Sequence, residues 1–225
     1  MEYITSSDFH FKDTAVALGK FEGIHRGHQL LMDEVKKQEL HGLRSVVFTF
    51  DRPTRLTLTG DTEYKQIYTK KERREILEKR GIDILIEHPF TKEFAALTPD
   101  RFIREVLVEK VGAKVIVVGT DFHFGKNRSG SITDLEKLEE ECGYHLIVVE
   151  KLQLNGKDIS STRIRASLEK GAMEEAKALL GRNYSVSGEI LHGNALGRTI
   201  QVPTINQQVP SFKLLPPNGV YVSKI

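Results

Sequence analysis

The chain has 225 residues, which is enough for one large domain or for a domain with a smaller second piece. Its composition of 39% hydrophobic and 28% charged residues is that of an ordinary globular protein. No apolar run approaches the roughly 18 residues that a membrane-spanning helix needs. The net charge of +2 comes from 33 basic and 31 acidic residues spread along the chain, which predicts no basic face for nucleic acid. We expect neither a membrane nor a nucleic-acid partner.

The N-terminal stretch "MEYITSSDFHFKDTAV" lacks the basic start, apolar middle and small-residue cleavage site of a secretory signal. The single cysteine, Cys142, excludes an internal disulfide framework and cannot by itself build a structural zinc site. A cytoplasmic location is therefore the expectation, with Cys142 inert.

Strand and helix patterns alternate over the first 150 residues. Five short, nearly continuous apolar runs predict strands covered on both faces, at residues 15–18, 45–50, 83–88, 114–119 and 145–150. Helical patterns lie between them at residues 29–40, 70–80, 99–111 and 132–142, and each is followed by a glycine suited to a helix end. The alternation predicts an α/β domain, a doubly wound parallel sheet with helices on both faces.

The alternation of strand and helix patterns ends after residue 150. Asn155-Gly156 predicts a tight turn, and two short helices are expected at residues 162–170 and 173–180. From Tyr184 onward, short strand-like runs alternate with Gly, Pro and Asn, which is typical of an all-β domain. About forty residues provide only two to four strands, so we expect an incomplete barrel. The predicted domains are residues 1–183 and residues 184–225.

The stretch "GKFEGIHRGHQ" places His25 and His28 where the first predicted strand passes into a helix. Gly27 between them would let a phosphate approach the backbone, and the helix start offers free N–H groups and a positive dipole. Two imidazoles there can stabilise charge that develops when an α-phosphate is attacked. The alternatives are two surface histidines, or a metal site that no further ligand cluster supports, so we expect no zinc.

The stretch "ISSTRIR" is a second candidate anion site. Ser160 or Ser161 can cap the helix that begins near Thr162, and Arg163 and Arg165 would converge with the helix start on an anion. The alternative is a helix cap with exposed arginines. Because two such helix starts follow strands of one sheet, one triphosphate spanning both would explain the pair.

The stretch "VGTDFHFGKNRSG" follows the fourth predicted strand as a long loop. Such a loop at the carboxyl end of a strand can stack a flat ring on Phe122 or Phe124 and place Asp121 near substrate or metal. The alternative is a mobile loop whose phenylalanines fill the core.

Together these stretches resemble the prokaryotic bifunctional riboflavin kinase/FAD synthetase family. "LGKFEGIHRGHQ" is similar to the family's G-N-F-D-G-V-H-x-G-H-Q, "VVGTDFHFGKNRSG" to its V-G-x-D-F-x-F-G-x-x-x-x-G, and "ISSTRIR" to its I-S-S-T-x-I-R. The resemblance implies a Rossmann-like nucleotidyltransferase fold for residues 1–183. It also implies an FMN adenylyltransferase that uses ATP, FMN and Mg²⁺ and releases FAD and pyrophosphate.

The resemblance also implies roles for individual residues. His25, His28 and Arg163 would be the catalytic residues. The residues implied to bind ATP are Gly19, Phe21, Gly23, His25, His28, Ser161, Thr162 and Arg163. Those implied to bind flavin or substrate are Asp121, Phe122, Phe124 and Arg128, with Mg²⁺ near Asp121.

The C-terminal stretch "HGNALGRTIQVPTIN" resembles the start of the family's riboflavin kinase barrel, in which Thr204 and Asn206 would bind Mg-ATP. Gln201, Val202 and Ile205 replace the family's Gly, Phe and Ala, and bulkier side chains there can crowd a phosphate-binding turn. Kinase activity, which converts riboflavin and ATP to FMN, is expected only if the barrel is complete in the intact protein.

The first module departs from the family pattern as well. Lys20 and Glu22 replace the usual Asn and Asp, and "FDRPTR" lacks the usual histidine. Glu22 adds a methylene where small misplacements are costly, so activity could be lowered or substrate preference shifted. Two alternatives to FAD synthesis stay open: a catalytically weak flavin- or nucleotide-binding homologue, and a nucleotidyltransferase with another acceptor.

Overall fold

The computed structural model describes residues 1–61, 63–192 and 204–225. Its centre is a six-stranded parallel sheet with the strand order β1-β4-β3-β2-β5-β6. The strands are β1 (Glu2–Ile4), β2 (Thr14–Leu18), β3 (Arg44–Phe50), β4 (Ile84–His88), β5 (Ala113–Gly119) and β6 (His145–Val149). The five predicted strands are confirmed, each within one residue at either end.

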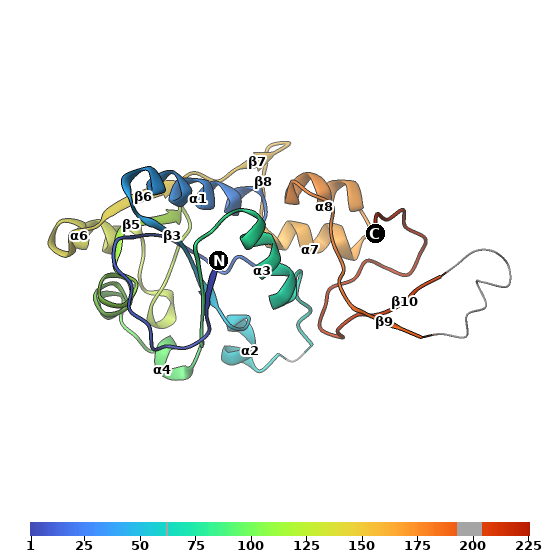
Figure 1. The fold of residues 1–225 in the computed structure, drawn as a ribbon, viewed down its shortest axis with the longest axis horizontal. Helices are drawn as coiled ribbons and strands as arrows, with labels where there is room; N and C mark the ends of the chain where they lie inside the picture. Colours follow the sequence, from blue (N-terminus) through green and yellow to red (C-terminus); the bar gives the residue numbers. More distant parts are fainter. Residues whose placement is uncertain (62, 193–203) are drawn as a thin grey trace.

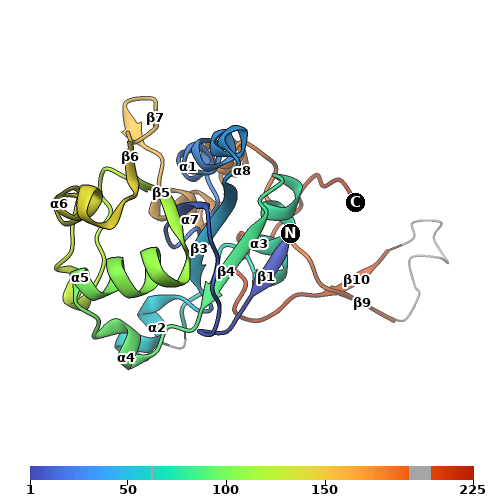
Figure 2. The same ribbon diagram turned by 60° about the vertical axis from the view of Figure 1, so that its left-hand side comes forward.

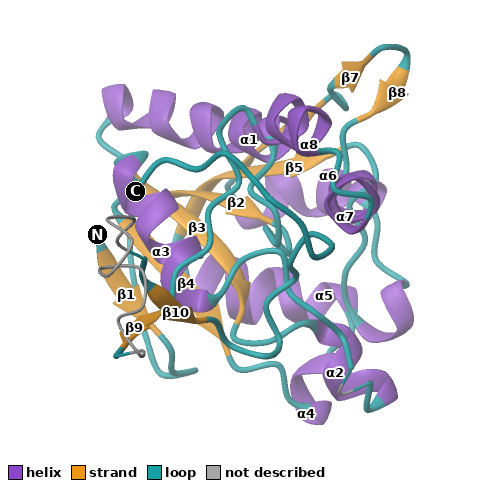
Figure 3. Cartoon of the chain, turned by 90° about the vertical axis from the view of Figure 1, so that its right-hand side faces the viewer, coloured by secondary structure: helices purple, strands orange, loops and turns teal. Residues whose placement is uncertain are grey.

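Helices cover both faces of this sheet (Figures 2 and 3). They are α1 (Arg26–Lys37), α2 (Thr54–Thr59), α3 (Lys70–Lys79), α4 (Lys92–Ala95), α5 (Pro99–Arg101) and α6 (Ile132–Cys142). Single turns of 3-10 helix lie at η1 (Gln38–His41) and η3 (Lys126–Arg128), and α5 continues into wider π-helical turns, η2 (Phe102–Lys110). The π-helical closure is visible where the Val111 N–H donates to the Val106 carbonyl, five residues back, at 2.9 Å.

Alternate residues of each strand face opposite layers, as the pleat requires. In β2, Ala15 and Ala17 pack beneath α1 and α3, whereas Val16 and Leu18 pack against η2 and α6. Both layers are buried, which explains why the strands are apolar throughout rather than alternating. A third apolar cluster joins α7 (Ser161–Glu169) and α8 (Met173–Leu180) to residues 67–68 and to Leu214.

The strand order reverses next to β2. The chain runs from β2 through β3 to β4 on one side, and β5 then pairs with β2 on the other. In doubly wound sheets a crevice for ligands lies at such a reversal, at the carboxyl ends of the strands. The loops that leave β2 and β5, residues 19–25 and 120–131, therefore start side by side where such a crevice is expected.

Several elements differ from the sequence-based expectation. Strand β1 and helices α2 and α4 are too short to show a periodic pattern, and none was expected. Helix α1 begins at Arg26 rather than at residue 29 because His25, an unusual capping residue, serves as its N-cap. The predicted turn at Asn155-Gly156 is confirmed between β7 (Gln153–Leu154) and β8 (Lys157–Asp158).

The C-terminal segment has two strands in the part that the structure describes, β9 (Glu189–Leu191) and β10 (Asn206–Gln208), which pair only with each other. Figure 1 shows β9 and β10 lying away from the six-stranded sheet. Gln201 and Val202 lie outside the described residues. Further along, Lys213 forms a bridge with Gln66, so the chain returns to the first module. The barrel stays a prediction.

Candidate active site

The loop after β2 is tightly folded and buried. Phe21 and Ile24 have φ angles of 45° and 41°, unusual for residues with a side chain, and both are fully buried. A Cβ atom at Gly19 would lie 3.0 Å from the Phe21 ring, so a side chain there would require the ring to shift. Such backbone strain persists only where surrounding contacts hold it, and it is often found at functional sites. We call residues 19–28 the histidine loop.

The two histidines of this loop are in direct contact. The Nδ1 atom of His25 accepts a hydrogen bond from the His28 backbone N–H at 3.2 Å, which caps α1. Their rings stack with centroids 3.6 Å apart, and the Phe21 ring meets His28 edge-on at 5.0 Å. Because Nδ1 of His25 is an acceptor, the neutral ring carries its proton on Nε2, where it can be donated to a ligand.

Both imidazoles are held in the neutral form. Burial, reinforced by the Arg182 charge, lowers the pKa of His25 to about 4, and nearby Asp121 opposes this shift only in part. Burial and the neighbouring His25 and Arg182 hold the pKa of His28 well below its usual value. At neutral pH the pair therefore offers hydrogen-bond donors rather than positive charges.

Two side chains that the sequence did not single out hold the histidine loop in place. The Arg182 guanidinium donates to the carbonyls of Gly23 at 3.0 Å and Ile24 at 2.8 Å. The Gln29 amide donates to the Ile24 carbonyl at 3.0 Å and to the Leu180 carbonyl at 2.8 Å. Their only sequence signals were the last residue of "HRGHQ" and a lone arginine after α8. Both depend on contacts more than 150 residues away in sequence.

The start of α7 lies against the histidine loop. Ser160 is the N-cap, since its hydroxyl accepts from the Arg163 N–H at 3.3 Å. A side chain placed at Gly23 would be 3.7 Å from the Ser161 hydroxyl, and one at Gly27 would be 4.0 Å from the Ile159 carbonyl. The structure thus brings the N-termini of α1 and α7 side by side, with Thr162 exposed beside them.

The two arginines of "ISSTRIR" point to different places. Arg163 donates to Glu175 at 2.9 Å and to the carbonyls of Leu154 and Lys157 at 3.0 and 3.2 Å, so it ties the β7–β8 turn to α8. Arg165 instead reaches Glu22 in the histidine loop and donates to the Lys65 carbonyl at 2.7 Å. Arg165, rather than the expected Arg163, is the arginine that the structure brings to the loop.

The Glu22 carboxylate accepts hydrogen bonds from several residues. Besides Arg165, it accepts from the Tyr64 hydroxyl at 2.8 Å and from the Ile67 N–H at 3.4 Å. The Arg165 guanidinium lies over the Tyr64 ring, 4.4 Å from its centroid. Glu22 therefore joins the histidine loop both to α7 and to the segment of residues 64–67.

The loop after β5 leaves the sheet next to the histidine loop, because β5 pairs with β2 in parallel. Phe124 is 7% exposed and packs on Phe102, with ring centroids 5.4 Å apart, so it belongs to the core. Phe122 is only half-buried and stacks on Phe124 at 5.5 Å. Asp121 is exposed and lies 3.2 Å from the Lys151 ammonium.

Positive charge collects between the two loops. The pKa of Lys20 is lowered by partial desolvation of its ammonium group and by the charge of Arg128, although Glu22 opposes the shift. Arg128 is exposed in the β5 loop, whereas Lys20 belongs to the histidine loop. Two cations whose charges repel each other across these loops suit an anionic ligand between them.

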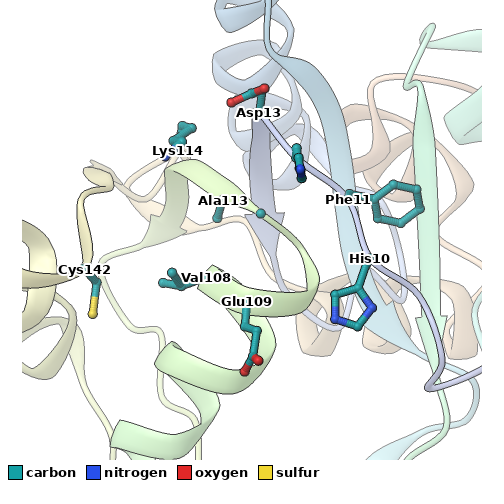
Figure 4. Close-up of a pocket in the computed structure, with 10 residues that line it drawn as sticks. His10, Phe11, Asp13, Val108, Glu109, Ala113, Lys114 and Cys142 are labelled. Atoms are coloured by element: carbon teal, nitrogen blue, oxygen red, sulfur yellow. The ribbon is translucent and has the colours of Figure 1, made fainter.

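A cleft of about 350 Å³ lies at the opposite edge of the sheet, where β2 and β5 begin (Figure 4). It is lined by charged side chains of both signs, including Lys114 and Glu109, together with Cys142. The Cys142 sulfur accepts from Arg104 at 3.6 Å. Ligands of parallel sheets bind at carboxyl ends, and this cleft lies at amino ends.

The residues of the kinase-like motif are far less enclosed. Thr204 and Asn206 are exposed, and Asn206 pairs with Leu191 in the β9–β10 hairpin. Among the residues that the structure describes, no hydrogen bond joins either side chain to the histidine loop.

Comparison with known proteins gives consistent results for both parts of the chain. The family model for FAD synthetase matches residues 8–163, and the model for riboflavin kinase matches residues 180–225. A bifunctional riboflavin kinase/FMN adenylyltransferase of Listeria monocytogenes is 34% identical, covering 98% of this chain and 70% of its own length. Its counterpart in Bacillus subtilis is 35% identical, covering 94% and 67%.

A crystal structure named as a macrolide-efflux protein of Streptococcus pneumoniae superposes with a TM-score of 0.86 at 31% identity, covering 98% of this chain and 73% of that one. Within the part of this chain that the structure describes, no helix is both long and apolar enough to cross a membrane. The sheet and the relatives agree: the chain belongs to the bifunctional riboflavin kinase/FMN adenylyltransferase family of nucleotidyltransferases, with an FAD synthetase domain and part of a riboflavin kinase domain.

Proposed function

We propose that this chain transfers AMP from ATP to FMN and releases FAD and pyrophosphate, and that the crevice between β2 and β5 is where it does so. The observation that carries the proposal is the pair of neutral, stacked histidines at the start of α1, directly beside the start of α7. Two adjacent helix N-termini give a triphosphate many N–H donors with little charge to neutralise first.

The reaction needs positioning and charge stabilisation more than covalent chemistry. A phosphate oxygen of FMN attacks the α-phosphorus of ATP, the bond from that phosphorus to the bridging oxygen breaks, and the electron pair leaves with pyrophosphate. His25 would donate a hydrogen bond from its Nε2–H group to an α-phosphate oxygen. His28, stacked on it, would help to stabilise the charge that develops on the same phosphate. Ser161 and Thr162 would hold the β- and γ-phosphates, and Arg165 would balance their charge on leaving Glu22.

The flavin would occupy the side of the crevice formed by the β5 loop. Phe122 is half-buried and can stack a flat ring, whereas Phe124 supports it from the core. Lys20 and Arg128 would hold the FMN phosphate. Gly19, Phe21 and Gly23 would shape the pocket beside the adenine nucleotide, because a Cβ atom at Gly19 would meet the Phe21 ring and one at Gly23 would meet Ile164.

Magnesium fits this site in one way. Among the described residues there is no group of three or more His, Cys, Asp or Glu that could hold a metal ion. However, Mg²⁺ in nucleotide enzymes is commonly held by one or two carboxylates together with substrate phosphates. Asp121, exposed at the crevice, would provide the protein oxygen. The ion would supply charge neutralisation on the phosphates.

The test is incubation of the purified chain with FMN, ATP and Mg²⁺, followed by chromatography for FAD and an assay for pyrophosphate. Equal amounts of FAD and pyrophosphate are expected. Riboflavin and nicotinamide mononucleotide in place of FMN serve as acceptor controls. Tight binding of FMN and ATP without turnover, or transfer to a different acceptor, would contradict the proposal.

Riboflavin phosphorylation is proposed only for a protein that carries the complete barrel, with Thr204 and Asn206 at its Mg-ATP site. A cytoplasmic location is part of the same proposal, since ATP is the AMP donor and Cys142, the chain's one cysteine, is free.

A further inference from the structure

Lys213 lies in the riboflavin-kinase part of the chain, yet three of the four residues around its ammonium, Ile67, Tyr68 and Glu72, belong to the FAD synthetase part. It is 3% exposed. Its ammonium donates to the Ile67 carbonyl at 2.7 Å and to the Glu72 carboxylate at 2.7 Å. The rings of Tyr68 and Tyr184 flank it, with centroids 4.6 and 4.4 Å from the nitrogen. We call these five groups the Lys213 box.

The box is more than a surface contact. Glu72, 2% exposed, also accepts from the N–H groups of Thr69 at 2.8 Å and Ser187 at 2.8 Å. The Tyr184 hydroxyl lies 2.8 Å from the Ile67 carbonyl and 2.6 Å from the Leu214 carbonyl. A fully enclosed ammonium keeps its charge only because a carboxylate and a carbonyl replace water around it.

Two routes lead from the box to the histidine loop. In the first, the Gln66 N–H donates to the Phe212 carbonyl at 2.6 Å, which pairs Gln66 with the segment around Lys213. The N–H of the next residue, Ile67, donates to the Glu22 carboxylate. In the second, the Tyr68 ring has Lys213 near it and the Arg182 guanidinium 5.1 Å from its centroid. Arg182 in turn holds the Gly23 and Ile24 carbonyls.

We propose that Lys213 is a positioning residue for adenylyl transfer: by closing the box it fixes Ile67 and Tyr68, and through Glu22 and Arg182 these hold the histidine loop in its strained, competent form. This inference rests on the proposed function. The segment around Lys213 is then, physically, part of the adenylyltransferase module, although it lies past residue 183 and inside the riboflavin-kinase match.

The experiment compares three variants of the full chain. K213M removes the ammonium, K213M/E72Q removes both charges so that no buried carboxylate is left unpaired, and K65M is the matched control. Lys65 also donates to this segment, at the Ser211 carbonyl at 3.0 Å, but from an exposed position outside the box. The steady-state kcat and KM for ATP and FMN are measured well below each variant's melting temperature.

We expect kcat to fall by about tenfold to a hundredfold in both K213M variants, the range in which small displacements of catalytic groups act. K65M should stay within about twofold of the wild type. In an R182K background, K213M should lower kcat by a markedly smaller factor, because the hold of Arg182 on the Gly23 and Ile24 carbonyls is already disturbed. A merely structural role would lower the melting temperature of the double variant without changing kcat in the folded enzyme. A folded K213M/E72Q with kcat within twofold of the wild type would overturn the proposal.

Hydrogen exchange separates this inference from the proposed function. Amides of residues 19–29 should exchange faster in K213M/E72Q than in the wild type, whether or not the chain makes FAD. If the wild type makes no FAD, the proposed function fails alone. If the loop's exchange is unchanged, the role of Lys213 fails alone.

Discussion

The chain carries two nucleotide-binding motifs in very different surroundings. The histidine loop lies at the carboxyl edge of a six-stranded sheet, with its carbonyls held by Arg182 and Gln29 and its side chains buried. Thr204 and Asn206 lie on or beside a two-stranded sheet, and all residues of its strands β9 and β10 are exposed. The difference shows that a sequence motif becomes a site only where other groups hold its backbone in place. Among the described residues, such groups surround the histidine loop and not Thr204 or Asn206.

The strongest test of this contrast is His28→Ala in the histidine loop. Losing one preorganised donor at a developing negative charge typically costs about a hundredfold to a thousandfold in rate. We expect a fall of that size in FAD formation, with kcat rather than KM most affected. His192, in the C-terminal segment next to the hairpin, is the matched control, and its replacement by alanine should change nothing. Comparable losses in both variants would contradict the contrast.

The enclosed histidines also predict a pH dependence of stability. The pKa of His25 is about 4 in the folded chain and about 6.5 when unfolded, so between these values the unfolded chain binds a proton that the folded chain does not. The free energy of unfolding should therefore fall as pH is lowered through this window, by about 2 kcal/mol for His25 between pH 7 and pH 5. Urea denaturation at both values measures it.

The control for this effect is His25→Gln, which keeps a hydrogen-bonding side chain but cannot titrate. The variant should lose part of the wild-type pH dependence, while His28 and His88, whose pKa values are also lowered by burial, retain theirs. An unchanged slope in His25→Gln would show that His25 is not the neutral, buried group described above.

The two arginines of the "ISSTRIR" stretch sharpen the contrast within one helix. Arg165→Ala removes the cation beside Glu22 and should lower the rate of FAD formation by roughly tenfold, a charge-assisted contact of about 1.5 kcal/mol. Arg163→Ala should leave the rate within about threefold and instead lower the melting temperature, because it frees the β7–β8 turn from α8. A larger loss of rate in Arg163→Ala than in Arg165→Ala would show that Arg163, and not Arg165, acts at the site.

The smallest effect is expected in the hairpin. Asn206→Ala should leave FAD formation within about twofold of the wild type, because the Asn206 side chain lies exposed on β10 and outside the Lys213 box. The same assay of FAD formation measures it. A large loss would mean that the hairpin takes part in adenylyl transfer.

Much of the fold could be predicted from the sequence. The core strands are continuous apolar runs closed by turn residues, and this local pattern is enough to place them within a residue. β1 could not be found, because three residues carry no period and its pairing with β4 depends on residues more than eighty positions away. Helix α1 was placed too late because its cap is a histidine rather than Ser, Thr, Asp or Asn.

The site was partly predictable for the same reason. His25, His28 and Ser161 stand in local motifs at helix starts. The expectation that both helices follow strands of one sheet is wrong for α7, which follows the separate β7–β8 pair, so strand order does not predict that the two helix starts meet. Which of Arg163 and Arg165 faces the loop depends on Glu175 and Glu22, which no local pattern identifies. Arg182 and Lys213 act through carbonyls and rings distant in sequence, and a lone basic residue gives no signal of such partners.

The pairing of β1 with β4 has a consequence for synthesis on the ribosome. Residues 2–4 have no sheet partner until residues 84–86 have left the exit tunnel. At about 5 to 20 residues per second, the first strand waits roughly 4 to 16 seconds. During that time Tyr3 and Ile4 are exposed, and Tyr3 cannot reach Glu87, its hydrogen-bond partner in the finished sheet. Strand β1 can therefore join the sheet only after β4 has been made, although it precedes β2 and β3 in the chain.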